Sequence, residues 1–425
     1  MTDFRCMSRE ELVSIRSKAL SEYNEYLKKD IKLDFSRGKP NSYQLDISQE
    51  MLNMAMTRED CFSESGLDCR NYGVLDGLPE MKRFFAEVFG VPENYISVGG
   101  NSSLQLMFDT LSRAMLFGVY GSALPWCQEG KLKWICVTPG YDRHFNITEK
   151  LGFELISVPM LEDGPDMDIV EELVKDPCVK GIWCVPKYSN PTGNTYSEQT
   201  VRRLLSMTCG APDFRIMWDN AYAVHDFTSN GDVLADVFSI AKEYGNVDRV
   251  FYFASTSKIT FPGGGVAFVA SSDNNRNYNL PYLSAQTIGY DKLNQLRHLK
   301  FFKTAENLRS HMLKQGAVIK SKFEVTLEAL SELRGSGIAS WTEPKGGYFI
   351  SLNVLPGCAK RVFQLMKDAG VALTAVGATY PYGKDPDDKN LRLAPTYSNE
   401  DELELATRIL VCSIKLAAIE KLLSE

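Results

Sequence analysis

The sequence has no excess of positive charge and no long apolar run. Its 425 residues carry 47 Lys and Arg against 54 Asp and Glu, which is a formal net charge of −7. Without a basic surface we expect no nucleic acid as a partner, and no binding to a membrane. No apolar run reaches the length of a membrane span, and the first thirty residues lack the apolar core of a signal peptide. We therefore expect a soluble, cytoplasmic protein.

Paired metal ligands are also absent. The ten cysteines include no CxxC pair, and none has a histidine at ligand spacing. This pattern excludes a zinc site and a disulfide framework, and we predict no metal. Cys136 and Cys184 lie within apolar runs, where a free thiol behaves as a small core residue in a reducing compartment. We therefore predict that the cysteines are core thiols.

The chain contains no internal repeat, low-complexity tract or Pro/Gly/Ser linker, and its 44% hydrophobic and 24% charged residues are typical of a globular protein. Short apolar runs alternate with longer amphipathic stretches between residues 95 and 270. This alternation predicts βαβ crossovers and an α/β fold with a mostly parallel sheet. The predicted strands cover residues 95–98, 134–137, 154–158, 181–185, 214–218, 249–253 and 265–270.

The two ends of the chain predict a second, smaller α+β domain. Ser8 and Glu11 have the spacing of a capping box and begin a helix predicted over residues 8–29. The C-terminal part predicts helical structure over 291–333, a strand over 347–352 and a helix over 399–423. We expect the domains to share a long helix. The predicted division is 1–45 (N-terminal helix and arm, part of the small domain), 46–300 (large domain) and 301–425 (small domain).

Polar residues follow several predicted strands, at the edge where parallel sheets bind ligands. Gly99–Ser103 precedes a helix that begins at Leu104, and the free N–H groups of a helix start suit a phosphate. Asn190, Asp219 and Lys258 come after three later strands. Buried singly, each would cost several kcal/mol, so these side chains either point to solvent or meet over a shared ligand.

The motifs of this chain resemble those of the fold-type I pyridoxal-phosphate aminotransferases of the aspartate aminotransferase superfamily, in the same order and at similar separations over nearly the whole chain. The resemblance implies a three-layer PLP-dependent transferase fold. The motifs are Asn71-Tyr72-Gly73 with Gly77-Leu78-Pro79-Glu80, Asn190-Pro191-Thr192-Gly193, Asp219 with Tyr222, Ser255-x-Ser257-Lys258, Pro344 to Phe349, and Leu391-Arg392-Leu393-Ala394.

The resemblance implies three catalytic residues, Lys258, Asp219 and Tyr222. Lys258 would carry pyridoxal 5′-phosphate and move a proton between the substrate and the cofactor. Asp219 would pair with the ring nitrogen, while Tyr222 and Asn190 would bind the ring hydroxyl oxygen. The Asn190-Pro191 bond is expected to be cis.

The resemblance also implies the remaining cofactor and substrate contacts. Tyr141 would stack on the ring. Arg392 would hold the substrate α-carboxylate beside Asn190, and Gly38 lies in the loop that closes over the substrate. Tyr72 would reach the phosphate from a neighbouring subunit, so a homodimer with shared active sites is expected. The other expected phosphate ligands are the N–H groups of Gly100 and Asn101 and the hydroxyls of Ser255, Ser102 and Ser257.

One departure concerns the phosphate. Where the family usually has an arginine after the lysine, this chain reads Gly263-Gly264-Gly265. Either the backbone approaches the phosphate closely or another cation replaces the arginine. The loop before Pro40 is cationic, so Arg37 or Lys39 either reads a second substrate carboxylate or is a solvated charge.

We hypothesise a transaminase with a ping-pong mechanism, which moves an amino group from aspartate or glutamate to a 2-oxo acid. A lyase on the same fold is the alternative enzyme. A non-catalytic PLP-binding regulator is a further alternative. It is disfavoured because the roughly thirty residues before the Gly38 loop are too few for a helix-turn-helix domain.

Overall fold

The computed structural model describes residues 3–424. Eight strands form its larger sheet in the order β2-β9-β8-β7-β6-β3-β4-β5. The neighbouring pairs β8-β7, β7-β6, β6-β3 and β3-β4 are parallel, while β9 is antiparallel to both β8 and β2. The prediction of a mostly parallel sheet is therefore confirmed. The strands are β2 Ile96–Val98, β3 Lys133–Thr138, β4 Glu154–Leu161, β5 Gly164–Pro165, β6 Val179–Cys184, β7 Arg215–Asp219, β8 Val250–Ser255 and β9 Ala267–Ser271.

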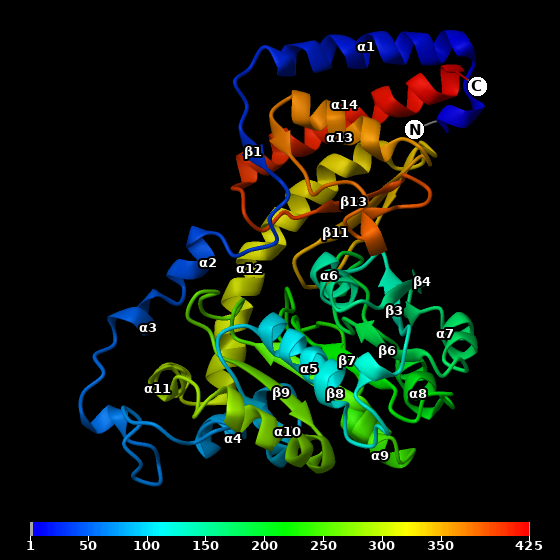
Figure 1. Cartoon of the computed structure of the whole chain (residues 1–425). Coiled ribbons are helices and arrows are strands. Elements are labelled where there is room, and N and C mark those ends of the chain that lie inside the picture. The colour runs from blue at the N-terminus through cyan, green and yellow to red at the C-terminus, as the bar shows by residue number, and fades with distance from the viewer. Residues whose placement is uncertain (1–2, 425) are drawn as a thin grey trace.

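Helices cover both faces of this sheet, because successive side chains of a strand point to opposite sides. On β3, Ile135 and Val137 join one buried cluster, and Trp134 and Cys136 join another. The fold thus has the three layers that the resemblance implies (Figure 1). One layer holds α4 Pro79–Phe89, α7 Met167–Leu173, α8 Glu198–Ser206 and α9 Val237–Glu243, and the other holds α5 Ser103–Phe117 and α6 Asp142–Lys150.

The smaller part of the molecule combines both ends of the chain. Ser8 caps α1 through the predicted capping box with Glu11, and α1 packs along α14. Together with β10, β11 and β13, these helices enclose a second buried cluster. The elements are α1 Arg9–Leu27, β1 Leu33–Asp34, β10 Ala339–Trp341, β11 Ile350–Val354, α13 Ala359–Asp368, β12 Val371–Ala372, β13 Asn390–Leu393 and α14 Glu400–Ser424.

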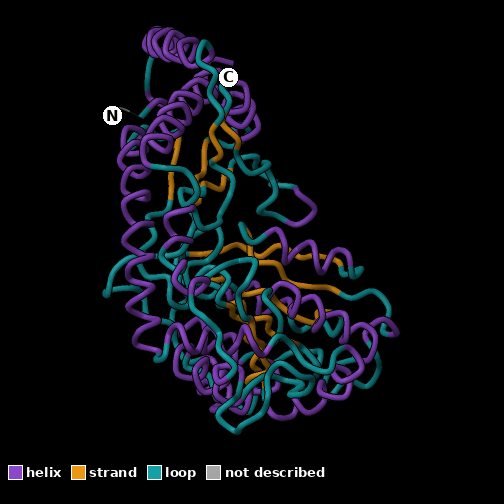
Figure 2. Tube along the Cα trace, turned by 90° about the vertical axis from the view of Figure 1, so that its left-hand side faces the viewer, coloured by secondary structure: helices purple, strands orange, loops and turns teal. Residues whose placement is uncertain are grey.

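The long helix α12, Ala305–Leu330, joins the two parts, as Figure 2 shows from the side. Its first turns place Leu308 and Met312 in the core below the large sheet, and its last turns place Phe323 and Leu330 in the smaller core. The helix is therefore shared, as expected. The boundaries proposed at residues 45 and 300 stay predictions, since α12 itself belongs to both cores.

Two predicted segments differ from the structure. Helical residues 291–333 are split, because Lys303 has φ 64° and Thr304 caps a new helix. The strand predicted over 347–352 starts later, at Ile350, because Gly347 has φ 79° and packs against Tyr188. The remaining helices are α2 Ser42–Asp46, α3 Gln49–Asn53, α10 Asp273–Gln286 and α11 Lys292–Phe302, with short 3-10 turns at Phe4–Cys6, Glu59–Cys61, Glu93–Tyr95, Trp126–Gln128, Val247–Arg249, Ser331–Leu333 and Pro381–Gly383.

The prediction that the cysteines are core thiols is wrong for Cys6 and Cys127, which are exposed. Each belongs to a single 3-10 turn in which the aromatic residue, Phe4 or Trp126, takes the buried position. Among residues 3–424 no two cysteines form a disulfide. Within residues 3–424, no helix is long and apolar enough to span a membrane, and no cluster of His, Cys, Asp and Glu could hold a metal ion.

Candidate active site

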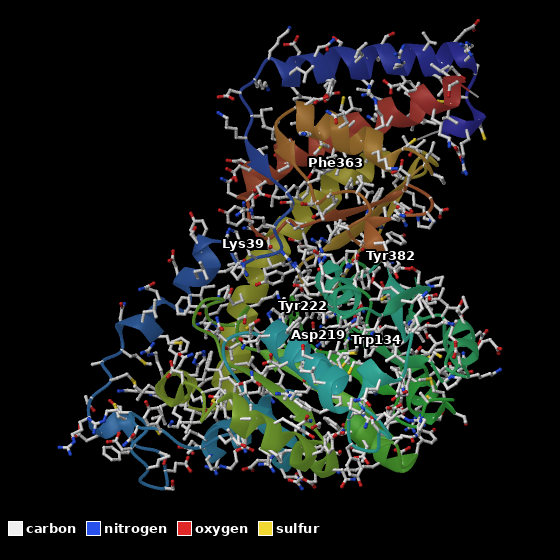
Figure 3. All side chains as sticks on the ribbon, in the orientation of Figure 1. Lys39, Trp134, Asp219, Tyr222, Phe363 and Tyr382 are labelled. Atoms are coloured by element: carbon white, nitrogen blue, oxygen red, sulfur yellow. The ribbon has the colours of Figure 1, made fainter. Side chains whose placement is uncertain are left out.

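A cavity opens at the carboxyl edge of the large sheet, beneath the smaller part of the molecule. Asp219 ends β7, and Tyr222 follows it on the next turn; Figure 3 shows both between the two parts of the molecule. The polar residues at successive strand ends therefore meet over one space instead of pointing to solvent. The lining consists of Gly38, Ser103, Leu104, Met107, Tyr141, Val185, Asn190, Asp219, Ala221, Tyr222, Lys258 and Phe349.

Asp219 is a buried carboxylate with one free oxygen. Its Oδ2 lies 2.9 Å from His144 Nε2, while its Oδ1 has no hydrogen-bond partner among residues 3–424. A buried carboxylate oxygen without a partner is unfavourable, so we expect a bound group to place a hydrogen-bond donor or a cation beside this oxygen. The protonated nitrogen of a pyridine ring would satisfy it.

His144 was not predicted as a site residue. It lies three residues after Tyr141 in the sequence, which brings it one helical turn along α6. That spacing was the available signal, because residues three apart share a helix face. The imidazole also stacks on Trp183 at a centroid distance of 4.3 Å, which fixes its ring plane beside Asp219.

Lys258 lies on the loop after β8 and lines the same cavity as Asp219. Desolvation lowers the pKa of its amine, and the nearby Asp219 charge only partly opposes this shift. The amine lies 5.1 Å from the ring centroid of Tyr222. Burial raises the pKa of Tyr222 well above its usual range and that of Tyr141 to about 12, so both phenols stay protonated hydrogen-bond donors at neutral pH.

Arg392, on β13, reaches the same site from the smaller part. Its Nη1 donates to Asn190 Oδ1 at 3.4 Å and to Asp142 Oδ1 at 3.0 Å. The guanidinium also lies 5.0 Å from the ring centroid of Phe349, which lines the cavity. The Asn190-Pro191 bond is cis, as expected. The Asp142 contact was not foreseen from the sequence.

The loop around Gly38 closes one side of the cavity. A Cβ atom at Gly38 would come within 2.0 Å of the Phe349 ring, so only glycine fits there without a shift. Its cationic neighbours are both engaged. Arg37 Nε lies 2.6 Å from Asp34 Oδ2, and Lys39 Nζ lies 4.2 Å from the ring centroid of Tyr397.

The residues expected to bind phosphate gather at the start of α5. Ser102 caps this helix by accepting a hydrogen bond from Gln105 N at 3.4 Å. Ser257 Oγ donates to the Asn101 carbonyl at 2.9 Å, and Ser255 Oγ donates to Ser257 Oγ at 3.0 Å. Gly100 adjoins this corner, while its own carbonyl accepts from Ala267 N.

Tyr72 is not brought to this site within one chain. It is 79% exposed and lines a separate pocket with Gly289 to Leu293. The single chain therefore offers the expected phosphate ligands except this tyrosine.

Three further histidines hold the segment that carries Lys258, and none was predicted. His225 Nε2 lies 3.3 Å from the Lys258 carbonyl oxygen, and His311 Nε2 lies 2.9 Å from that of Ile259. His298 Nε2 lies 3.0 Å from Thr256 Oγ1. Each is distant from Lys258 in the sequence, so no local spacing could have indicated these contacts.

Comparisons with known proteins find sequences and structures similar to this chain. The family model for aspartate amino-transferase matches residues 7–425. An aspartate aminotransferase from Corynebacterium glutamicum is 48% identical over 400 residues, which is 94% of this chain and 92% of that protein.

Two solved structures extend the comparison. The crystal structure of an aspartate transaminase from Corynebacterium glutamicum superposes with a TM-score of 0.97 at 46% identity and covers 99% of both chains. An α-aminoadipate aminotransferase from Thermus thermophilus, solved with N-(5′-phosphopyridoxyl)-L-leucine, shares the fold at 22% identity, with a TM-score of 0.74 over 94% of this chain and 95% of that one.

Proposed function

Since this chain belongs to the aspartate aminotransferase family and is an aminotransferase, we propose that it moves the amino group of aspartate or glutamate to a 2-oxo acid in two half-reactions. Its cofactor is pyridoxal 5′-phosphate, which stores the amino group between the half-reactions and withdraws electrons from the substrate Cα. The observation that carries the proposal is the free, buried Oδ1 of Asp219 in the cavity that also holds Lys258.

Different residues of the cavity would contact different parts of the cofactor. Asp219 Oδ1 would accept from the ring nitrogen, with His144 orienting the carboxylate from the other oxygen. Tyr222 and Asn190 would bind the ring hydroxyl oxygen, and Tyr141 would cover one ring face. The phosphate would lie at the start of α5, on the N–H groups of Gly100 and Asn101 and the hydroxyls of Ser102, Ser255 and Ser257.

Lys258 is the proposed base. Because desolvation lowers the pKa of its amine, a larger share of the amine is neutral at physiological pH than in water. A neutral amine can take a proton from the substrate Cα and hold it at Nζ for return.

Arg392 is the proposed binding residue for the substrate α-carboxylate. Its planar guanidinium can hold a carboxylate through two parallel hydrogen bonds, with Asn190 beside it. The exposed Arg37 and Arg143 and the half-buried Lys39 are candidates for a second carboxylate; Arg143 adjoins Asp142, its Nε 4.0 Å from Asp142 Oδ2. The dicarboxylate assignment is supported by the relatives named aspartate aminotransferase.

We also propose a cytoplasmic homodimer with shared sites. The exposed Tyr72 is suited to reach the phosphate of a second copy, because it stands free of its own cavity. The absence of a disulfide among the cysteines of residues 3–424 is in keeping with a reducing compartment.

The half-reaction tests this function directly. The purified holoenzyme is mixed with aspartate, glutamate, alanine or tyrosine, and conversion to the pyridoxamine form is followed by absorbance. We expect conversion with the two acidic donors, and its loss by at least about a thousandfold in Lys258→Ala. The exposed Lys345→Ala is the control and should retain full activity.

Other outcomes would contradict parts of the proposal. Release of ammonia and a 2-oxo acid without formation of the pyridoxamine form would indicate a lyase. The absence of any cofactor absorbance band would contradict the assignment as an enzyme that uses this cofactor. A preference for alanine or tyrosine would remove the dicarboxylate assignment. If aspartate is preferred, the variants Arg37→Ala, Lys39→Ala and Arg143→Ala will show which residue binds its side-chain carboxylate, because only that substitution should weaken the preference.

A further inference from the structure

The glycine loop after Lys258 is held by two asparagine side chains. Asn101 Nδ2 donates to the carbonyls of Pro262 and Gly263, at 3.3 and 3.4 Å. Asn294 Nδ2, on α11, donates to the carbonyls of Gly264 and Gly265, at 2.9 and 3.0 Å. Four successive carbonyl oxygens of one loop are therefore bound by amides from two different elements.

The same helix holds the other end of this segment. His298, one turn after Asn294, donates from Nδ1 to the Asn294 carbonyl, which can only accept, at 2.8 Å. Its Nε2 is then the acceptor for the hydroxyls of Thr256 and Thr260, both at 3.0 Å. Burial lowers the pKa of His298 to about 4, so the ring is neutral at physiological pH and keeps this acceptor.

The loop forms one wall of the corner where the phosphate is expected. A Cβ atom at Gly265 would lie 3.0 Å from Ser257 N and 3.2 Å from the Phe261 carbonyl, so the backbone there packs closely on Ser257. Ser257 Oγ in turn binds the Asn101 carbonyl. A side chain at Gly265 would not fit without a shift, which agrees with the absence of an arginine at this position.

The N–H groups of this loop are only partly used. Gly264 N donates to the Phe261 carbonyl, and Val266 N donates to Thr256 Oγ1 at 2.9 Å. Within residues 3–424, the N–H groups of Gly263 and Gly265 have no acceptor. With the carbonyls turned to the two asparagines, these two donors remain for an anion.

We propose that Asn294 and His298 are positioning residues for the cofactor phosphate. They hold the glycine loop so that its neutral backbone, with Asn101, Ser255 and Ser257, takes the place of a phosphate-binding arginine. This inference rests on the proposed function, because it requires pyridoxal phosphate at this corner.

The test compares two ligands that differ only in the phosphate. Apoenzyme with Lys258 intact is titrated with pyridoxal 5′-phosphate and with pyridoxal, and the dissociation constants are measured by absorbance and intrinsic fluorescence. We expect Asn294→Ala to weaken pyridoxal 5′-phosphate about tenfold, the effect of losing one to two hydrogen bonds, and to change pyridoxal less than twofold. Asn307→Ala is the matched control, because Asn307 Nδ2 also donates to a backbone carbonyl, that of Phe302, away from the loop.

A second variant and a second ligand keep the test decisive. Asn294→Asp preserves the size of the side chain but removes the two donors, and it should reproduce the selective loss. Inorganic phosphate, which protects the apoenzyme against thermal unfolding when it binds, should protect both Asn294 variants less than wild type.

The outcomes separate this inference from the proposed function. If wild type binds pyridoxal 5′-phosphate but the Asn294 variants bind it equally well, or lose both ligands to the same extent, the positioning role is wrong and the function stands. If wild type binds no pyridoxal 5′-phosphate, the proposed function is wrong and the positioning role with it.

Discussion

Asp142 competes for the guanidinium that we assign to the substrate. Its Oδ1 lies 3.0 Å from Arg392 Nη1, where a substrate α-carboxylate would also bind. Because two carboxylates repel each other at one cation, substrate must displace or share this contact. We predict that Asp142→Asn lowers KM for all amino donors about fivefold and changes kcat less, which steady-state kinetics with aspartate will measure.

A remote ion pair provides the control for this variant. Asp176 pairs with Lys133 at 2.8 Å, at the opposite end of β3 from the cavity. Asp176→Asn should leave KM unchanged. If Asp142→Asn instead raises KM, then Asp142 orients Arg392 for binding and does not compete with the substrate.

At the scale of elements, α12 is held against the segment that follows Tyr222. A Cβ atom at Gly316 would lie 2.3 Å from the Asp226 carbonyl oxygen and 3.2 Å from Phe227 Cα. Helix propensity alone would make Gly316→Ala stabilising by about 1 kcal/mol. The backbone contact makes Gly316→Ala destabilising, because the Asp226 carbonyl and Phe227 Cα are backbone atoms that cannot rotate away. We predict that the substitution lowers the free energy of unfolding by about 2 kcal/mol, measured by urea unfolding.

A substitution on the exposed face of the same helix is the control for Gly316→Ala, because it changes helix propensity without changing packing. Lys320 pairs with Glu324 on that face, and Lys320→Ala should change the free energy of unfolding by less than about 0.5 kcal/mol. A stabilising Gly316→Ala would show that α12 can move away from residues 226–227 at little energetic expense.

At the scale of the whole molecule, buried histidines make stability depend on pH. Burial lowers the pKa of His225 to about 3 and that of His298 to about 4, from the ordinary 6.5, and lowers that of His311. The unfolded chain therefore binds more protons than the folded one below pH 6.5. His225 and His298 should each lower the free energy of unfolding by about 1 kcal/mol per pH unit as the pH falls from about 6.5 to 5, and His311 acts in the same direction.

Urea unfolding of the apoenzyme at several pH values between 7.5 and 5 measures this slope. His298→Gln removes one of these titrating groups and should reduce the slope by about 1 kcal/mol per pH unit. An unchanged slope in this variant would mean that His298 takes up its proton without unfolding.

Much of the fold and the cavity could be predicted because the signals are local. Alternating apolar runs indicated the strands of the large sheet, and the Ser8–Glu11 spacing indicated the first helix. The parallel topology then requires that residues after successive strands share one edge. For this reason Asn190, Asp219 and Lys258 could be brought together from the sequence, and the structure does bring them to one cavity.

The tertiary structure decided what depends on contacts between distant parts of the chain. The bonds of His144 to Asp219, Asp142 to Arg392, and Asn294 to the glycine loop join residues that no periodicity relates. The exposure of Cys127 likewise follows from which side of a short turn faces the core. The sheet, and the edge at which the polar site residues gather, could be predicted from the amino-acid sequence, because both follow from local patterns and chain direction. Only the packed molecule decided which partner each polar group meets, because those partners come from other elements.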